Sequence, residues 1–190
     1  MAHQVEIEPL AIAGCMLLRG SVHRDDRGCF YEAWREGNSA AAGIPAFVQD
    51  NVSLSHRNVI RGIHVQYPRP QGKLIHVVSG QVWDVCVDLR RGSPTFRQWL
   101  GIMLEEADGR QIYLPPGVAH GFSVLSNTAA VSYKCTDYYE PAGEVTIRWN
   151  DPSLAIEWSV PEPMLSVKDR NAPLLAEIAV ERLPVYGEQR

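Results

Sequence analysis

Stretches in which apolar and polar residues alternate recur along the chain and are separated by turns rich in glycine and proline. A period of two is typical of β-strands, whose successive side chains point to opposite faces of a sheet. The regular spacing of these stretches favours an antiparallel sandwich or barrel over parallel βαβ units. Residues 23–28 fit a turn rich in charge, and residues 38–42 fit a single helical turn. The clearest predicted strands are residues 47–55, 82–89, 96–104 and 130–135.

The pattern changes after Pro161, where residues 173–178 have the composition of a helix. This is the one segment for which the pattern predicts a regular helix, packed as a tail on the β core. A chain of 190 residues fits one domain and is long enough to bury a sizeable core. We therefore expect a single, mainly β domain over residues 1–190, with a β core over about 1–160 and a short C-terminal helical tail over about 161–190.

The centre of the chain places several polar side chains on two neighbouring apolar strands. One strand contains Arg61, His64 and Gln66, and the alternation puts His64 and Gln66 on the same face. A turn rich in proline and glycine then returns the chain as a second strand near Lys73. A single histidine on an apolar strand is more often a hydrogen-bonded core residue than a catalyst. Here the density of ionisable groups favours a functional site.

Two other predicted strands each allow two interpretations. Residues 29–34 place Glu32 between two aromatic residues on one face, which fits either an exposed edge strand or an acidic and aromatic platform for a polar ring. In the next strand, Gln49, Asn51 and Ser53 share one face. These residues form either a solvated sheet face or a row that hydrogen-bonds a sugar or a base.

Composition and charge narrow the classes of partner. The formal net charge is −4 with both signs interspersed, so the chain has neither a basic stripe for nucleic acid nor a polybasic face for a membrane. No apolar run approaches the roughly 18 to 20 residues of a membrane span, and no apolar segment follows a basic start as in a secretory signal. We expect a cytoplasmic protein whose partners are small molecules or proteins.

The four cysteines are widely spaced and form no C-x-x-C pair. This spacing supports neither a zinc ribbon nor a redox motif. We expect all four to be reduced core residues, because each lies in an apolar, strand-like run: Cys15, Cys29, Cys86 and Cys135.

A second informative stretch covers residues 109–122, where a Pro-Pro-Gly turn delivers His120 to a strand. Its glycine, proline and histidine spacing resembles the second motif of the cupins, which are double-sheet jelly rolls. The first cupin motif binds a metal through H-x-H and a downstream Glu, whereas His64-Val65-Gln66 supplies only one of those histidines. We therefore expect a cupin-type antiparallel jelly roll without a metal.

Motifs spread over nearly the whole chain resemble one metal-free cupin family, the dTDP-4-dehydrorhamnose 3,5-epimerases. They follow one another in the family's order and with similar spacing. The motifs are Asp26-Arg27-Gly28 with Glu32, Phe47-Val48-Gln49-Asp50-Asn51, Arg61-Gly62-Ile63-His64, Gly72-Lys73-Leu74, residues 85–96, residues 115–122, Tyr133-Lys134-Cys135-Thr136-Asp137-Tyr138-Tyr139, residues 147–152 and Leu165-Ser166-Val167-Lys168-Asp169.

The resemblance implies an enzyme that inverts the two carbons beside the ketone of a dTDP-linked 4-keto-6-deoxy sugar without a cofactor. His64 is then the base that removes the proton at C5 and later at C3. Asp169 is its partner, because a carboxylate on the second ring nitrogen fixes the tautomer and raises the basicity of the imidazole. Lys73 stabilises the enolate. Tyr133 is the acid on the opposite face.

The resemblance also implies a set of substrate-binding residues and a homodimer, in which exchanged N-terminal strands carry some of these residues into the neighbouring subunit. Two positions depart from the family. Val65 replaces a common aromatic residue and is expected to face away from His64, and His76 replaces a non-ionisable residue or arginine and is expected to be a structural surface residue. The implied binding residues are Arg27, Glu32, Gln49, Asn51, Arg61, His120, Glu144 and Lys168.

Three alternatives remain at this point. A relative that inverts only one carbon, or acts on another nucleotide sugar, would use the same catalytic residues. A metal-dependent cupin oxygenase or isomerase is disfavoured by the missing H-x-H motif. A non-catalytic sugar-binding cupin would not need Lys73, Tyr133 and a pair formed by His64 and Asp169.

Overall fold

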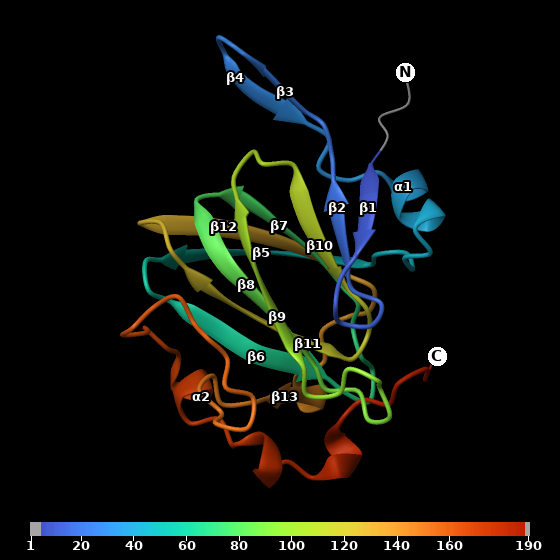
Figure 1. Ribbon diagram of the computed structural model, residues 1–190, viewed down its shortest axis with the longest axis vertical. Helices are drawn as coiled ribbons and strands as arrows, with labels where there is room; N and C mark the ends of the chain where they lie inside the picture. Colours follow the sequence, from blue (N-terminus) through green and yellow to red (C-terminus); the bar gives the residue numbers. More distant parts are fainter. Residues whose placement is uncertain (1–4, 189–190) are drawn as a thin grey trace.

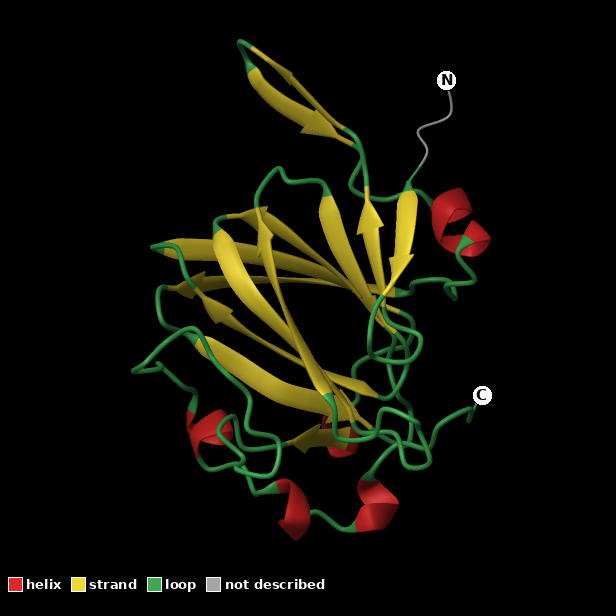
Figure 2. Cartoon of the chain, viewed as in Figure 1, coloured by secondary structure: helices red, strands yellow, loops and turns green. Residues whose placement is uncertain are grey.

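The computed structural model describes residues 5–188 and shows two antiparallel sheets that face each other across an apolar interior (Figures 1 and 2). In sheet order, the first sheet contains β1 (Glu6–Pro9), β2 (Met16–Arg19), β10 (Arg110–Leu114), β7 (Lys73–Ser79), β12 (Thr128–Cys135) and β5 (Gln49–His56). The second contains β13 (Glu144–Thr146), β6 (Ile60–Gln66), β11 (Val118–Val124), β8 (Gln81–Asp88) and β9 (Trp99–Glu105). This is the antiparallel jelly roll that the sequence predicts.

Strand β8 illustrates how alternation builds the core. Val82 and Cys86 point into the space between the sheets, where residues from both sheets form one apolar cluster. Val85 and Val87 point to the outer face of the second sheet and pack against the C-terminal part of the chain. Each fully buried aliphatic side chain contributes roughly 1.5–3 kcal/mol to folding. Strand β8 is therefore anchored on both faces.

The segment after Pro161 covers the outer face of the second sheet but contains little regular helix. The helix predicted over residues 173–178 is wrong, since only the 3-10 turn Leu175–Glu177 forms there. A segment this short has little helical stability of its own. The packing of Leu175 and Ile178 against the second sheet sets its path instead. The helical elements of the tail are α2 (Val167–Arg170) and the 3-10 turns Leu175–Glu177 and Val180–Arg182, and a further 3-10 turn spans Pro141–Gly143.

A two-stranded hairpin of β3 (Val22–Asp25) and β4 (Gly28–Tyr31) projects from the body of the molecule (Figure 1). The charge-rich turn predicted over residues 23–28 is too long, because residues 23–25 pair as part of β3. The prediction of a buried Cys29 is also wrong, as this thiol is exposed on the hairpin while the other three are buried. The strand ends before Glu32, which therefore shares no strand face with the neighbouring aromatic residues.

The outer face of the first sheet is partly covered by residues 36–47. The predicted helical turn near residue 40 is confirmed as α1 (Glu36–Ala41), and Ile44 behind it packs on the sheet. His76, expected at the surface, is half-buried on this sheet, and its ring meets Tyr31 of the hairpin edge-on at 5.4 Å. Among residues 5–188, no helix combines the length and the apolar character needed to cross a membrane.

Candidate active site

A cavity of about 470 Å³ opens between the two sheets. The row formed by Gln49, Asn51 and Ser53 faces this cavity, which favours the ligand-binding interpretation of that strand over a solvated sheet face. Ten of the twelve residues predicted for the site line the cavity: His64, Lys73, Tyr133, Asp169, Gln49, Asn51, Arg61, His120, Glu144 and Lys168.

His64 and Asp169 form a hydrogen-bonded pair on one wall. His64 lies on β6, and its Nε2 is 2.6 Å from Oδ1 of Asp169 on α2. The hydroxyl of Ser166 caps α2 by accepting a hydrogen bond from the backbone N–H of Asp169 at 3.0 Å. Asp169 is only 3% exposed. Burial by itself would raise the pKa of this carboxyl, but the hydrogen bond and the charge of His64 outweigh it and hold the pKa below its usual value.

Lys73 and Tyr133 come from the first sheet, on the adjacent strands β7 and β12. The Nζ of Lys73 is 6.0 Å from the centroid of the Tyr133 ring. Burial lowers the pKa of Lys73, because it disfavours the ammonium form, and raises the pKa of Tyr133, because it disfavours the phenolate. The imidazole of His64 thus lies on one sheet, paired with a carboxylate from α2, and a cation and a phenol lie on the other sheet.

His120 has a carboxylate partner that the sequence analysis missed. Its Nε2 is 2.8 Å from Oδ2 of Asp84, which is completely buried on β8. The other oxygen, Oδ1, has no hydrogen-bond partner among the described residues. Asp84 therefore orients His120 toward the cavity. An acidic residue at an inward-facing position in the middle of a β-prone strand was the signal that the sequence offered.

The mouth of the cavity carries a chain of polar contacts. Lys168 donates a hydrogen bond from Nζ to Oε1 of Glu144 at 2.7 Å, and the hydroxyl of Tyr139 donates to Oε2 at 3.1 Å. Burial would raise the pKa of Glu144, but these partners and the charge of His64 keep it below the usual value. Tyr139 was part of a motif in the sequence, but the sequence analysis did not select it as a site residue.

Two predicted binding residues do not reach the cavity of their own chain. Arg27 lies on the projecting hairpin and pairs with Asp25. Glu32 follows that hairpin and pairs with Arg35. Val65 packs on the outer face of the second sheet, away from His64, as expected.

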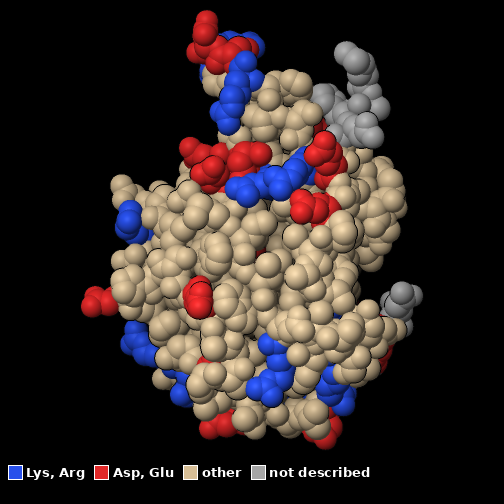
Figure 3. All heavy atoms as spheres, in the orientation of Figure 1, with Lys and Arg blue, Asp and Glu red and all other residues tan. Residues whose placement is uncertain are grey.

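Charges and potential metal ligands are dispersed. On the face that Figure 3 shows, basic and acidic side chains are interspersed over the body of the molecule and the hairpin. No group of three or more His, Cys, Asp or Glu side chains within residues 5–188 is arranged to hold a metal ion.

Comparisons with known proteins agree on one family. A family model described as dTDP-4-dehydrorhamnose 3,5-epimerase matches residues 9–177. The dTDP-4-dehydrorhamnose 3,5-epimerase of Pseudomonas aeruginosa is 48% identical over 171 residues, which cover 88% of this chain and 94% of the relative. The epimerase of Methanothermobacter thermautotrophicus is 41% identical over 171 residues, covering 88% of this chain and 92% of the relative.

Solved structures of epimerases are similar to this chain over nearly its whole length. The epimerase RmlC of Legionella pneumophila, in complex with dTDP-4-keto-L-rhamnose, superposes with a TM-score of 0.93 at 44% identity and covers 97% of this chain and 100% of its own. A 3'-monoepimerase from Streptomyces bikiniensis, in complex with dTDP, superposes with a TM-score of 0.85 at 37% identity and covers 94% of this chain and 92% of its own.

Proposed function

The chain belongs to the dTDP-4-dehydrorhamnose 3,5-epimerase family, and we propose that its cavity converts dTDP-4-keto-6-deoxy-D-glucose to dTDP-4-keto-L-rhamnose by inverting C3 and C5. The protein is thus an isomerase. The observation that carries the proposal is the placement of His64, paired with Asp169 of α2, on one sheet and of Lys73 and Tyr133 on the other. The reaction only moves protons, so these side chains supply its chemistry without a redox step or a cofactor.

The first step is removal of the proton at C5. A hydrogen on carbon becomes acidic beside a carbonyl, because its loss gives an enolate with the charge on oxygen. His64 accepts this proton, and Asp169 holds the ring in the competent tautomer and stabilises the imidazolium. The ammonium of Lys73, aimed at the C4 oxygen in a water-poor cavity, contributes on the order of 3 to 4 kcal/mol to the stability of the enolate.

The second step returns a proton to the opposite face of the same carbon. Tyr133 fits this role because it lies on the other sheet and because its raised pKa keeps the hydroxyl protonated. Once His64 has released its proton to solvent and Tyr133 has regained one, repetition of both steps at C3 completes the double inversion. The base and the acid act from opposite walls, so the sugar does not have to turn over between the two proton transfers.

The remaining cavity residues bind the nucleotide and the sugar. Arg61 suits a pyrophosphate, because a guanidinium pairs bidentately with phosphate oxygens. The amides of Gln49 and Asn51, which hydrogen-bond each other at 3.0 Å, suit the polar edges of a base or sugar. His120, Glu144 and Lys168 complete the predicted binding set.

We further propose that the protein acts as a homodimer in which the hairpin of each subunit reaches the cavity of the other. This would bring Arg27 and Glu32 to the nucleotide, which neither reaches within its own chain. Apolar side chains that a second copy would cover are exposed on the hairpin and on the edge strand β5, among them Phe30, Val52 and Leu54. The cytoplasmic location suggested by the sequence stays a prediction.

The test is proton NMR of dTDP-4-keto-6-deoxy-D-glucose incubated with the purified protein in deuterated water. Deuterium at both C3 and C5, with a rhamnose-type product trapped by a reductase, would support the double epimerase. His64→Asn should abolish exchange while nucleotide binding persists. Exchange in neither position would overturn the substrate assignment, and metal analysis of the protein would then be the next measurement.

A specific observation favours one alternative, the inversion of a single carbon. One structural relative is described as a 3'-monoepimerase. The same base, acid and cation serve both reactions, so the difference lies in how the sugar is held after the first inversion. Deuterium at one carbon alone in the NMR experiment would assign this chain to the single-epimerase class.

A further inference from the structure

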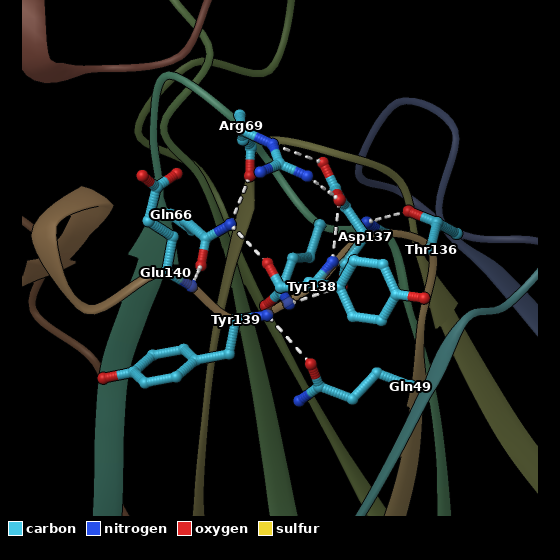
Figure 4. Close-up of polar contacts among 10 residues, drawn as sticks. Gln49, Gln66, Arg69, Thr136, Asp137, Tyr138, Tyr139 and Glu140 are labelled. Atoms are coloured by element: carbon cyan, nitrogen blue, oxygen red, sulfur yellow. Dashed lines mark hydrogen bonds and ion pairs between the residues drawn. The ribbon is translucent and has the colours of Figure 1, made fainter.

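Gln66 lies on β6 two residues after His64, but its amide is engaged by neighbouring backbone. Its Nε2 donates to the carbonyl of Arg69 at 2.6 Å and to the carbonyl of Tyr138 at 3.1 Å. Its Oε1 accepts from the N–H of Glu140 at 2.7 Å. The residue is 5% exposed. Figure 4 shows the side chain joining these groups.

Two of these three hydrogen bonds hold the backbone of residues 138–140, the segment that follows β12. A second amide holds the same segment from the first sheet, since Oε1 of Gln49 accepts from the N–H of Tyr139 at 2.8 Å (Figure 4). Gln71 adds a bond from its Nε2 to the carbonyl of Asp137 at 2.7 Å. The segment lacks strand pairing of its own, so side-chain amides satisfy its backbone groups.

The segment supplies the rim of the cavity. Tyr139 projects from it, and its hydroxyl reaches Glu144, which pairs with Lys168. All three side chains line the cavity. The position of this rim therefore depends on whether residues 138–140 are held in place.

We propose that Gln66 is a positioning residue that holds residues 138–140 over the cavity and thereby sets the affinity for the dTDP-linked ligand. It takes no part in proton transfer. Ordering the segment before the ligand arrives removes a conformational cost from binding. The nature of the ligand rests on the proposed function, whereas the hold on the segment rests on the hydrogen bonds alone.

Two substitutions at Gln66 test the proposal. Gln66→Met removes all three hydrogen bonds without adding charge, and Gln66→Glu places a carboxylate oxygen against two carbonyl oxygens. We expect the Kd for dTDP, measured by calorimetry, to rise about tenfold in Gln66→Met and further in Gln66→Glu. The KM should rise in parallel, and kcat at saturating substrate should stay within about twofold. Gln98→Glu, an exposed position outside the cavity, is the matched control and should change none of these values.

A double-mutant cycle shows whether Gln66 acts through the segment. In a Tyr139→Ala background, Gln66→Met should raise the Kd for dTDP by less than about twofold. Hydrogen exchange of the ligand-free protein should be faster at the amide of Glu140 in Gln66→Met than in the wild type.

Several results would overturn the proposal. The first is a fall in kcat with an unchanged KM, which would mean that His64 is displaced. The others are additive effects in the double-mutant cycle and unchanged exchange at the Glu140 amide. A wild-type protein that binds no dTDP would instead overturn the proposed function, and the exchange measurement would still decide the role of Gln66.

Discussion

The Nε2 atom of His64 lies 2.6 Å from Oδ1 of Asp169, although the two residues are 105 positions apart in the chain. The histidine is on β6, an inner strand of the second sheet, and the aspartate is on a four-residue helix that Ser166 caps. A neutral ring that donates from Nε2 to the carboxylate keeps its lone pair on Nδ1, which is then the atom that can accept a proton.

Asp169→Asn should preserve the geometry of the pair but remove the carboxylate's control over the tautomer of the His64 imidazole. An amide can donate to Nε2 as well as accept from it, and it cannot stabilise an imidazolium by charge. We expect kcat to fall by about 10²- to 10⁴-fold, while the Kd for dTDP changes little. Steady-state kinetics and calorimetry measure the two quantities. A normal kcat would show that the carboxylate is dispensable.

Tyr133→Phe should separate proton abstraction from inversion. Without the hydroxyl, His64 can still remove and return the proton on one face, so deuterium should continue to enter at C5. Formation of inverted product should fall by about 10²- to 10⁴-fold. Tyr138→Phe is the matched control, because Tyr138 is exposed and does not line the cavity. Equal losses of exchange and inversion in Tyr133→Phe would remove this residue from the role of acid.

The activity should fall at alkaline pH because of Lys73. Burial places its pKa below the ordinary value of 10.5, so the ammonium is lost as the pH rises through that lowered pKa. Tyr133 stays protonated in this range, because burial raises its pKa above 10.0. We expect kcat to decline as the pH rises, with the midpoint of the decline below pH 10.5. Lys73→Arg should move this decline to higher pH. An unchanged decline in Lys73→Arg would assign it to another group.

Subunit complementation tests the exchanged hairpin. His64→Asn and Arg27→Ala subunits should each form weakly active or inactive homodimers. In a mixed dimer, one cavity would combine an intact His64 with the intact Arg27 of the partner subunit, so mixing under conditions of subunit exchange should restore activity. If each hairpin serves its own chain, every cavity in the mixture carries one defect and no activity returns.

Asp84→Asn should act through His120. The substitution weakens the contact that orients the imidazole and leaves a buried polar group without an ideal partner, at a cost of about 1–3 kcal/mol in stability. We expect KM to rise about tenfold, and the rise should vanish in a His120→Ala background. Urea unfolding and steady-state kinetics give the two readouts. A KM effect that persists without His120 would mean that Asp84 acts elsewhere.

The sequence by itself determined the fold class and most of the candidate site. Alternation along the chain predicted the strands, since side-chain direction in a strand depends only on its period of two. The family resemblance then selected ten residues that line one cavity. Alternation alone does not say which face of a strand meets the cavity. Arg61 and His64 are three positions apart and would lie on opposite faces of a regular strand, yet both line the cavity, because the pairing of β6 with β11 shifts register between them.

Only the tertiary structure decided which distant groups meet. The partnership of Asp84 with His120 and the grip of Gln66 on residues 138–140 depend on contacts between separate strands and loops, which no local pattern encodes. The C-terminal segment took a 3-10 turn instead of the expected helix, because packing of Leu175 outweighed a weak local preference. Arg27 lies away from the cavity for the same kind of reason, since the hairpin that bears it projects from the body of its own chain.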